Sequence, residues 1–270
     1  MDPARPTLQP RFGVPNCLDM ASSGRCSPYA FGVKFEDCEA VLFDLDGVLT
    51  PTADVHMRAW QSMLSDFLLR RGIAEPYVSS DYFHYIDGKP RYEGVRSFLH
   101  SRGISLPDGD PSDPPTAETV CGLGNRKNEV FAAVLADEGV IPYPGTAELL
   151  DQLAERGTKT AVVSSSRNAP SVLEAAGLQE RFSVVVDGAV AGDLGLAGKP
   201  SAETFVHAAT ELGADVARSA VIEDALSGVA AGKAGGFGLV VGIDRGVGSD
   251  RLTEAGADLV VTDLAALIAP

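Results

Sequence analysis

Short apolar runs alternate with helical runs over the second half of the chain. Five of these runs have the length and composition of buried strands: TKTAVVSS, FSVVVD, SAVIED, GLVVGI and DLVVTD, at 158–165, 182–187, 219–224, 238–243 and 258–263. Residues 201–213 and 264–269 instead repeat their apolar positions at helical spacing. Strands that alternate with helices predict a parallel sheet with helices on both faces.

A sixth apolar run lies near the start of the chain. Residues 41–50 read VLFDLDGVLT, a buried strand that ends in two carboxylates, Asp44 and Asp46. This run is too apolar to stand alone, so we expect it to join the same sheet. The predicted fold class is therefore α/β, with a Rossmann-like parallel sheet covered by helices on both faces.

Residues 54–141 separate this first strand from the others and follow a helical pattern. After Thr52, apolar residues such as Trp60 and Phe67 keep helical spacing until Gly72. Residues 76–130 continue as helices with loops, and the Pro- and Asp-rich segment 105–116 reads as an exposed loop. We therefore expect an inserted helical cap domain after the first strand.

The domain boundaries follow from these patterns. Residues 1–36 are rich in Pro, Gly, Ser and Arg without a sustained period, which favours a flexible extension. Residues 37–53 and 142–270 form the predicted α/β core, and residues 54–141 form the predicted cap.

Composition narrows the function classes. The chain has 270 residues, of which 45% are hydrophobic, and its net charge is −15. A phosphate backbone attracts a positive protein surface, so this charge argues against nucleic-acid binding. No apolar run approaches the roughly 20 residues that span a bilayer, and the first 20 residues lack the apolar core of a secretory signal. We expect a cytoplasmic monomer that acts on a small molecule, without a membrane or nucleic-acid partner.

Polar residues stand at the ends of three predicted strands. Asp44, Ser164 and Asp224 each lie at a carboxyl end, where parallel α/β sheets bind their ligands. Carboxylates gathered there repel one another and are costly to desolvate, so the site needs positive charge from a lysine or a metal ion.

Four separated motifs make the chain resemble the haloacid dehalogenase superfamily. They are Asp44-Leu-Asp46-Gly-Val-Leu-Thr50, Ser164 in AVVSSS, Lys199 in GKPSAETF, and Glu223-Asp224 after SAVI. The resemblance covers the chain from about residue 37 to its end.

Further detail is similar to the β-phosphoglucomutase branch of that superfamily. The matching segments are His56 to Trp60, Asp87-Gly88-Lys89-Pro90-Arg91, Asn125-Arg126-Lys127-Asn128 and Ser166-Arg167-Asn168. The chain departs from the pattern at Pro51, which replaces an Asp, and at Ala225, which replaces a Ser. These departures leave phosphoryl chemistry intact but do not define the substrate.

The resemblance implies roles for the residues that match. Asp44 is the expected nucleophile that forms an aspartyl-phosphate, and Asp46 is the expected general acid and base. Mg²⁺, a cation that prefers oxygen ligands, is the implied cofactor. Its expected ligands are Asp44, Asp46, Glu223 and Asp224. The expected phosphate-binding residues are Thr50, Ser164 and Lys199. The expected substrate or cap residues are His56, Trp60, Arg91, Lys127, Ser166, Arg167 and Asn168.

Two enzymatic functions fit this pattern. A mutase would interconvert β-glucose 1-phosphate and glucose 6-phosphate, and it would need a second phosphate pocket, which Arg91 and Arg167 could form. A phosphatase would let water, activated by Asp46, hydrolyse the same intermediate on a small sugar phosphate. Because both enzymes carry Asp46, the core motifs do not separate them, and the cap cations favour the mutase.

Two other classes fit less well. A non-catalytic binding protein on this fold would be expected to lack some of these acids, and all of them are present. A dehalogenase attacks carbon and needs neither Asp46 nor a metal.

Overall fold

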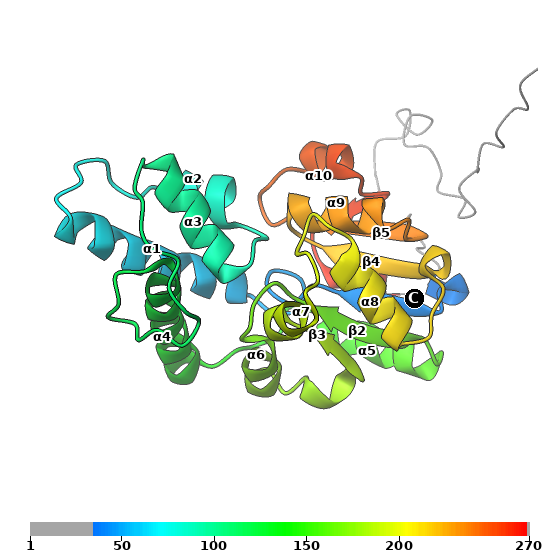
Figure 1. Cartoon of the computed structure of the whole chain (residues 1–270). Helices are drawn as coiled ribbons and strands as arrows, with labels where there is room; N and C mark the ends of the chain where they lie inside the picture. The colour runs from blue at the N-terminus through cyan, green and yellow to red at the C-terminus, as the bar shows by residue number, and fades with distance from the viewer. Residues whose placement is uncertain (1–34, 269–270) are drawn as a thin grey trace, which may run out of the picture.

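The computed structural model describes residues 35–268, so most of the predicted extension 1–36 lies outside the described residues. Six parallel strands form one sheet in the order β3-β2-β1-β4-β5-β6, as Figure 1 shows. The strands are β1 Ala40–Phe43, β2 Lys159–Val163, β3 Val184–Val186, β4 Ser219–Glu223, β5 Leu239–Ile243 and β6 Leu259–Val261. The predicted parallel α/β fold is confirmed.

The helices fall into two groups along the chain. Those between β1 and β2 are α1 Thr52–Arg70, α2 Ser79–Asp81, a π-helix at Tyr82–Ile86, α3 Arg91–Ser101, α4 Val120–Glu138 and α5 Thr146–Glu155. Those after β2 are α6 Ala169–Ala175, α7 Gly188–Leu194, α8 Glu203–Glu211, α9 Leu226–Ala234 and α10 Ser249–Ala255. Short 3₁₀ helices lie at Phe35–Asp37, Gln179–Arg181, Val216–Arg218 and Leu264–Leu267.

The two faces of the sheet pack against different helices. Alternate residues of β1 point to opposite faces, so Val41 and Phe43 join one apolar cluster while Leu42 joins another. The first cluster includes α5 and α6, and the second includes α8, α9 and α10. Because the strands β1, β4 and β5 are buried throughout, their segments read as continuous apolar runs in the sequence.

A third apolar cluster lies within the helices from α1 to α4, which we call the helical insertion. Trp60, Phe67, Phe98 and Leu123 belong to it. Figure 1 shows these helices as a group beside the sheet. Val55 in the first turn of α1 and Phe131 in the second half of α4 pack instead in a cluster of the sheet. The exact domain boundaries of the sequence analysis therefore stay a prediction.

Three details refine the predicted elements. The loop at 105–116 is confirmed as mostly exposed and without helix or strand. Helical structure continues to Glu138, past the predicted limit at 130. Within the described residues, the helical run predicted at 264–269 forms only a 3₁₀ turn at Leu264–Leu267, which Asp263 caps by accepting from the N–H of Ala266. Its two apolar anchors, Leu264 and Leu267, are buried, and such a short segment gains little from further helical bonds.

The strand order places the functional region. β1 is central in the sheet and pairs with β2 on one side and with β4 on the other. The strands that follow it therefore lie first on one side of β1, as β2 and β3, and then on the other, as β4 to β6. Ligands bind outside the carboxyl ends of the strands at such a switch point. Within residues 35–268, no helix has the length and apolarity needed to cross a membrane.

Candidate active site

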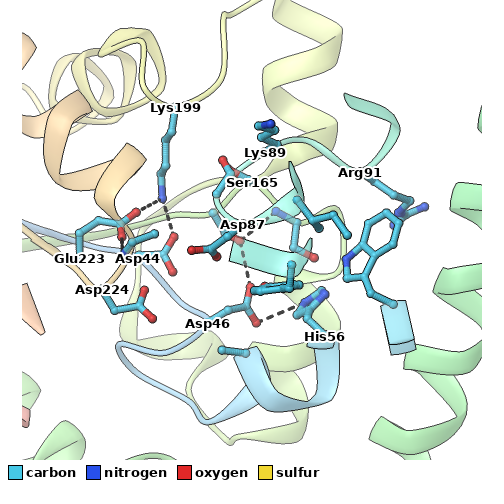
Figure 2. A pocket seen from close by; sticks show the side chains of 18 of the residues that line it. Asp44, Asp46, His56, Asp87, Lys89, Arg91, Ser165, Lys199, Glu223 and Asp224 are labelled. Atoms are coloured by element: carbon cyan, nitrogen blue, oxygen red, sulfur yellow. Dashed lines mark hydrogen bonds and ion pairs between the residues drawn. The ribbon is translucent and has the colours of Figure 1, made fainter. Parts of the chain in front are cut away.

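Asp44 stands immediately after β1 and is held by a buried lysine. Lys199 Nζ lies 2.5 Å from Asp44 Oδ1 and 2.6 Å from Glu223 Oε1, and it also donates to the Val163 carbonyl at 3.0 Å. Lys199 is only 5% exposed. Three neighbouring strands thus converge on one ammonium group, as Figure 2 shows for Asp44 and Glu223.

Asp46 has a different set of partners, although it is only two residues away. The Thr52 hydroxyl donates a short hydrogen bond to Asp46 Oδ1, and His56 Nε2 lies 3.4 Å from the same oxygen. The Ser164 hydroxyl donates to Asp46 Oδ2 at 3.4 Å. The two carboxylates of the motif therefore lie in distinct environments, one bound by a cation and the other by hydroxyls and an imidazole (Figure 2).

These environments move the two pKa values apart. Burial raises the pKa of Asp44 to about 8, although Lys199 opposes the shift, and the charges of Glu223 and Asp46 add to it. Burial also favours a raised pKa at Asp46, but the charge and hydrogen bond of His56 and the Thr52 hydroxyl bring its pKa below the usual value. Paired titratable groups whose pKa values are pushed apart are typical of acid–base sites.

Asp224 packs against the turn of the first motif. Gly47 has φ +93°, and a Cβ placed on it would lie 1.9 Å from Asp224 Oδ2. Only glycine allows both this backbone conformation and this close approach. Burial and the charges of Glu223 and Asp44 raise the pKa of Asp224 well above its usual range.

The acids of this site carry more charge than Lys199 neutralises. Asp44, Asp46, Glu223 and Asp224 all line one pocket, and Lys199 is the buried lysine that contacts two of them, Asp44 and Glu223. Within residues 35–268, no group of three or more His, Cys, Asp or Glu side chains already forms a metal site. A site made of two carboxylates, a backbone carbonyl and waters needs no third side chain, and Asp44, Asp224 and the Asp46 carbonyl supply oxygen donors of the kind that suits Mg²⁺. The residues present therefore fit a hard divalent cation.

Glu223 has both carboxylate oxygens engaged. Oε1 binds Lys199, and Oε2 accepts from the backbone N–H of Ala225 at 2.8 Å. Its predicted role as a metal ligand stays a prediction, while its contact with Lys199 is direct.

The helical insertion contributes a buried imidazole and a buried lysine. His56 Nδ1 lies 2.5 Å from Lys127 Nζ, and the His56 ring stacks on Phe131 with 4.1 Å between centroids. Burial, with the charge of Arg91, lowers the pKa of Lys127 to about 7, and burial, with the charge of Lys127, lowers the pKa of His56. The Lys127 ammonium also lies 5.5 Å from the centre of the Trp60 ring. Trp60 is part of the insertion's apolar cluster and also lines the pocket.

An asparagine joins the insertion to the loop after β2. Asn128 Oδ1 accepts from Arg91 Nη2 at 2.8 Å and from Asn168 Nδ2 at 2.6 Å. Burial and the nearby charge of Arg167 lower the pKa of Arg91, which places the two guanidinium groups in each other's field. Two predicted substrate or cap residues, Arg91 and Asn168, thus share one uncharged acceptor.

Most predicted site residues line the same pocket. These are Asp44, Asp46, His56, Trp60, Arg91, Lys127, Ser164, Ser166, Lys199, Glu223 and Asp224. Arg167 and Asn168 lie outside its lining, next to Arg91 and Asn128.

Thr50 also lies away from the pocket. It is fully buried, and its hydroxyl lies 2.7 Å from that of Thr52 and 3.2 Å from the Leu45 carbonyl. These contacts stabilise the turn of the motif away from the pocket. The predicted contact of Thr50 with phosphate stays a prediction.

Sequence reasoning missed three residues of the site. Thr52 holds Asp46, Asn128 bridges two segments, and Asp87 adds a further carboxylate to the pocket. The last two stand inside motifs that were singled out for other residues. Their own roles depend on contacts across the chain, which no local pattern displays.

Comparison with known proteins agrees with this geometry. A family model described as haloacid dehalogenase-like hydrolase matches residues 38–236. The β-phosphoglucomutase of Mycobacterium bovis is 47% identical over 242 residues, which cover 86% of this chain and 92% of that protein. The trehalose-phosphate phosphatase of Mycobacterium leprae is 38% identical over 131 residues, covering 47% of this chain and 29% of that protein. The solved structure of a β-phosphoglucomutase from Clostridium difficile has a TM-score of 0.70 at 24% identity, and the match covers 85% of this chain and 93% of that one.

Proposed function

The chain belongs to the haloacid dehalogenase-like hydrolase family and is an enzyme of its phosphomutase or phosphatase kind, and from this premise we propose that it is a β-phosphoglucomutase. It would convert β-glucose 1-phosphate to glucose 6-phosphate through an aspartyl-phosphate on Asp44. The observation that carries the proposal is the separate partnering of the two motif acids, Asp44 with Lys199 and Asp46 with Thr52 and His56.

The proposed reaction has two phosphoryl transfers. In one, an Asp44 oxygen attacks a phosphorus of glucose 1,6-bisphosphate, the ester P–O bond breaks, and Asp46 gives its proton to the leaving sugar oxygen. In the other, Asp46 takes the proton from the 6-hydroxyl of β-glucose 1-phosphate while that oxygen attacks the phosphorus on Asp44, and the acyl-phosphate P–O bond breaks to release the Asp44 carboxylate. Asp46 returns to its starting protonation state after the pair of steps.

The other residues have supporting roles in this proposal. Lys199 and Ser164 orient the transferring phosphoryl group, and His56 and Thr52 hold Asp46 in place. Mg²⁺, when bound by Asp44, Asp224 and the Asp46 carbonyl, would neutralise the phosphoryl charge so that a carboxylate can approach it. We propose that the helical insertion is the cap that excludes water, which would otherwise hydrolyse the phosphoenzyme.

The mutase is favoured over a phosphatase by the cations that lie apart from Lys199. Arg91 from the insertion and Arg167 from the sheet domain lie close enough for Arg167 to lower the pKa of Arg91. A bisphosphate intermediate needs a second anion site of this kind, and these guanidinium groups suit a phosphate. A phosphatase of small sugar phosphates is the second candidate, supported by the relative in Mycobacterium leprae.

One assay separates the two candidates. The enzyme is given Mg²⁺, β-glucose 1-phosphate and a trace of glucose 1,6-bisphosphate, and both glucose 6-phosphate and free phosphate are followed. We expect isomer formation to exceed phosphate release, with α-glucose 1-phosphate as the unreactive control. Phosphate release without isomer would refute the mutase. Turnover that survives in Asp44→Asn would refute the aspartyl-phosphate.

We also propose that the enzyme works as a cytoplasmic monomer without a nucleic-acid partner. Its net charge of −15 supports the last point, because nucleic acid would be repelled. Light scattering coupled to size-exclusion chromatography tests the monomer, for which we expect a mass near 28.2 kDa.

A further inference from the structure

A fifth carboxylate reaches the site from the helical insertion, and the mechanism above does not use it. Asp87 follows the π-helix and lines the same pocket as Asp44, Asp46 and Arg91. Figure 2 shows its side chain projecting from the insertion toward Asp44. Burial and the charge of Glu223 raise the pKa of Asp87 to about 6, so its carboxyl group is mostly ionised at neutral pH.

The backbone that carries Asp87 is fixed on two sides. Within the insertion, the N–H of Asp87 donates to the Tyr82 carbonyl at 2.9 Å. Toward the sheet domain, the Gly88 carbonyl accepts from the Ser165 hydroxyl at 3.1 Å. Gly88 has φ +69°, and a Cβ on it would lie 1.9 Å from Ser227 Oγ, so this residue presses closely on the sheet domain. Asp87 is therefore held in position rather than carried on a free loop.

The chemistry of Asp87 restricts what it can bind. An ionised carboxylate only accepts hydrogen bonds, and it repels phosphate oxygens. The Tyr82 hydroxyl and the Gly88 N–H already donate to it. Any ligand group at its remaining acceptor positions must therefore be a donor, such as a hydroxyl, and not a phosphate.

The cationic side chains around Asp87 indicate which part of a substrate carries that hydrogen-bond donor. Lys199 beside Asp44 suits one phosphate, and Arg91, four residues after Asp87, suits another. In a phosphorylated sugar, the part between two such anions is the ring with its hydroxyl groups. We propose that Asp87 is a specificity-determining residue that accepts a hydrogen bond from a ring hydroxyl of the sugar. This inference rests on the proposed phosphosugar chemistry and assigns the sugar-recognising group within it.

The test compares substrates with and without ring hydroxyls. We expect Asp87→Asn to lower kcat/KM for β-glucose 1-phosphate about 10- to 100-fold, the range typical of a lost hydrogen bond to a charged group. Hydrolysis of p-nitrophenyl phosphate, which offers no ring hydroxyl, should change less than about threefold because the core chemistry is untouched. Asp137→Asn makes the same chemical change at an exposed position of α4 and should leave both rates unchanged.

Deoxy sugars identify the hydroxyl. Among the 2-, 3- and 4-deoxy analogues of β-glucose 1-phosphate, one should react slowly with the wild-type enzyme and lose nothing further in Asp87→Asn, since the partner is already missing. Tyr82→Phe removes a hydrogen-bond donor that orients Asp87. It should reduce the preference for β-glucose 1-phosphate over p-nitrophenyl phosphate, by a smaller factor than Asp87→Asn does. This second variant keeps the test informative if Asp87→Asn unfolds.

Three results would overturn the inference. Equal losses on both substrates would give Asp87 a general rather than a specific role. A tenfold or larger change in Mg²⁺ affinity, measured by the shift of the thermal unfolding midpoint, would place Asp87 in the metal's water shell instead. An Asp87→Asn enzyme that keeps the wild-type rates on both substrates would exclude any role in recognition.

The same experiment separates this inference from the proposed function. A wild-type enzyme that hydrolyses p-nitrophenyl phosphate but turns over no sugar phosphate refutes the proposed function and the inference together. A wild-type enzyme that prefers the sugar, with the preference unchanged in Asp87→Asn, refutes the inference alone.

Discussion

At the scale of single residues, the site depends on acidic side chains that are close in the sequence but have different neighbours in the structure. Asp44 and Asp46 are two residues apart, yet Lys199 binds one and Thr52 and His56 hold the other. Because a strand end turns sharply at Gly47, the two carboxylates point to different partners. This separation is what the proposed roles require, in which one acid is the nucleophile and the other transfers protons.

Gly47 offers a direct test of that turn. In Gly47→Ala, the new Cβ would collide with Asp224 and adopt an unfavourable φ. We expect activity to fall at least about 100-fold, since small displacements of reacting groups have effects of that size, and stability to fall by about 1–2 kcal/mol. The measurements are steady-state kinetics and urea unfolding.

Gly72→Ala is the matched control for this change. Gly72 has φ +66° with nothing within 4 Å of a Cβ, so the substitution adds backbone strain without a collision. It should lose a similar amount of stability and keep full activity. If both variants lost activity alike, contact with Asp224 would not be the cause.

At the scale of elements, two long helices connect the insertion to the sheet. α1 and α4 each contribute residues to the insertion's apolar cluster and to a cluster of the sheet, as Trp60 and Val55 do for α1. Asn128 also joins the insertion to the loop after β2, because it accepts from Arg91 within the insertion and from Asn168 beyond it. The position of the insertion over the site therefore depends on apolar packing and on a few hydrogen bonds, including those of Asn128 and of Gly88 with Ser165.

Loss of that asparagine should loosen the insertion. Asn128→Ala leaves Arg91 and Asn168 without their shared acceptor, so we expect KM for the phosphosugar to rise about 10-fold with a smaller change in kcat. The radius of gyration from small-angle X-ray scattering should increase without ligand and return to the wild-type value with substrate.

Asn125→Ala provides the comparison on the same helix. Asn125 donates to the Pro111 and Asp113 carbonyls and accepts from Tyr92, all within the insertion. Its loss should lower stability but leave the radius of gyration unchanged. An equal expansion in the two variants would contradict a bridging role for Asn128.

At the scale of the whole molecule, strands from distant parts of the chain bring like charges together. Asp44, Glu223 and Asp224 come from β1 and β4, and burial raises the pKa of Asp44 to about 8 from the ordinary 3.8. Between these two values the folded protein binds more protons than the unfolded chain at Asp44. Its contribution to stability therefore decreases as the pH rises from about 4 to about 8.

Asp44→Asn tests this linkage. In buffer with a chelator, the variant should be more stable than the wild type, by on the order of 1 kcal/mol or more at pH 8 and by less at pH 5. Urea unfolding at several pH values measures the difference, and the lowered pKa values of His56 and Lys127 act in both proteins and cancel. Added Mg²⁺ should reduce the difference. A difference that does not vary with pH would contradict the raised pKa of Asp44.

The sequence by itself determined the features that depend on a repeating pattern or on residues close together in the chain, namely the strands, the helices and the acids at strand ends. Continuous apolar runs predicted the strands, because a strand buried on both faces has no polar side, and helical spacing predicted α1 and α8. The motif acids were found because each follows a strand, where parallel sheets bind ligands. The gathering of Asp44, Ser164 and Asp224 around one pocket followed from the same rule, whereas Lys199 was expected there from the family resemblance.

Only the tertiary structure decided which atom each of these side chains contacts. Thr50 is engaged behind the turn, both oxygens of Glu223 are taken by Lys199 and Ala225, and Asn128 and Asp87 join the site from the insertion. Local pattern gives the face on which a residue lies, but the direction and partners of its side chain depend on segments that are remote in the sequence. Packing of the insertion against the sheet brings those segments together, and so the structure rather than the sequence set the partners of each acid.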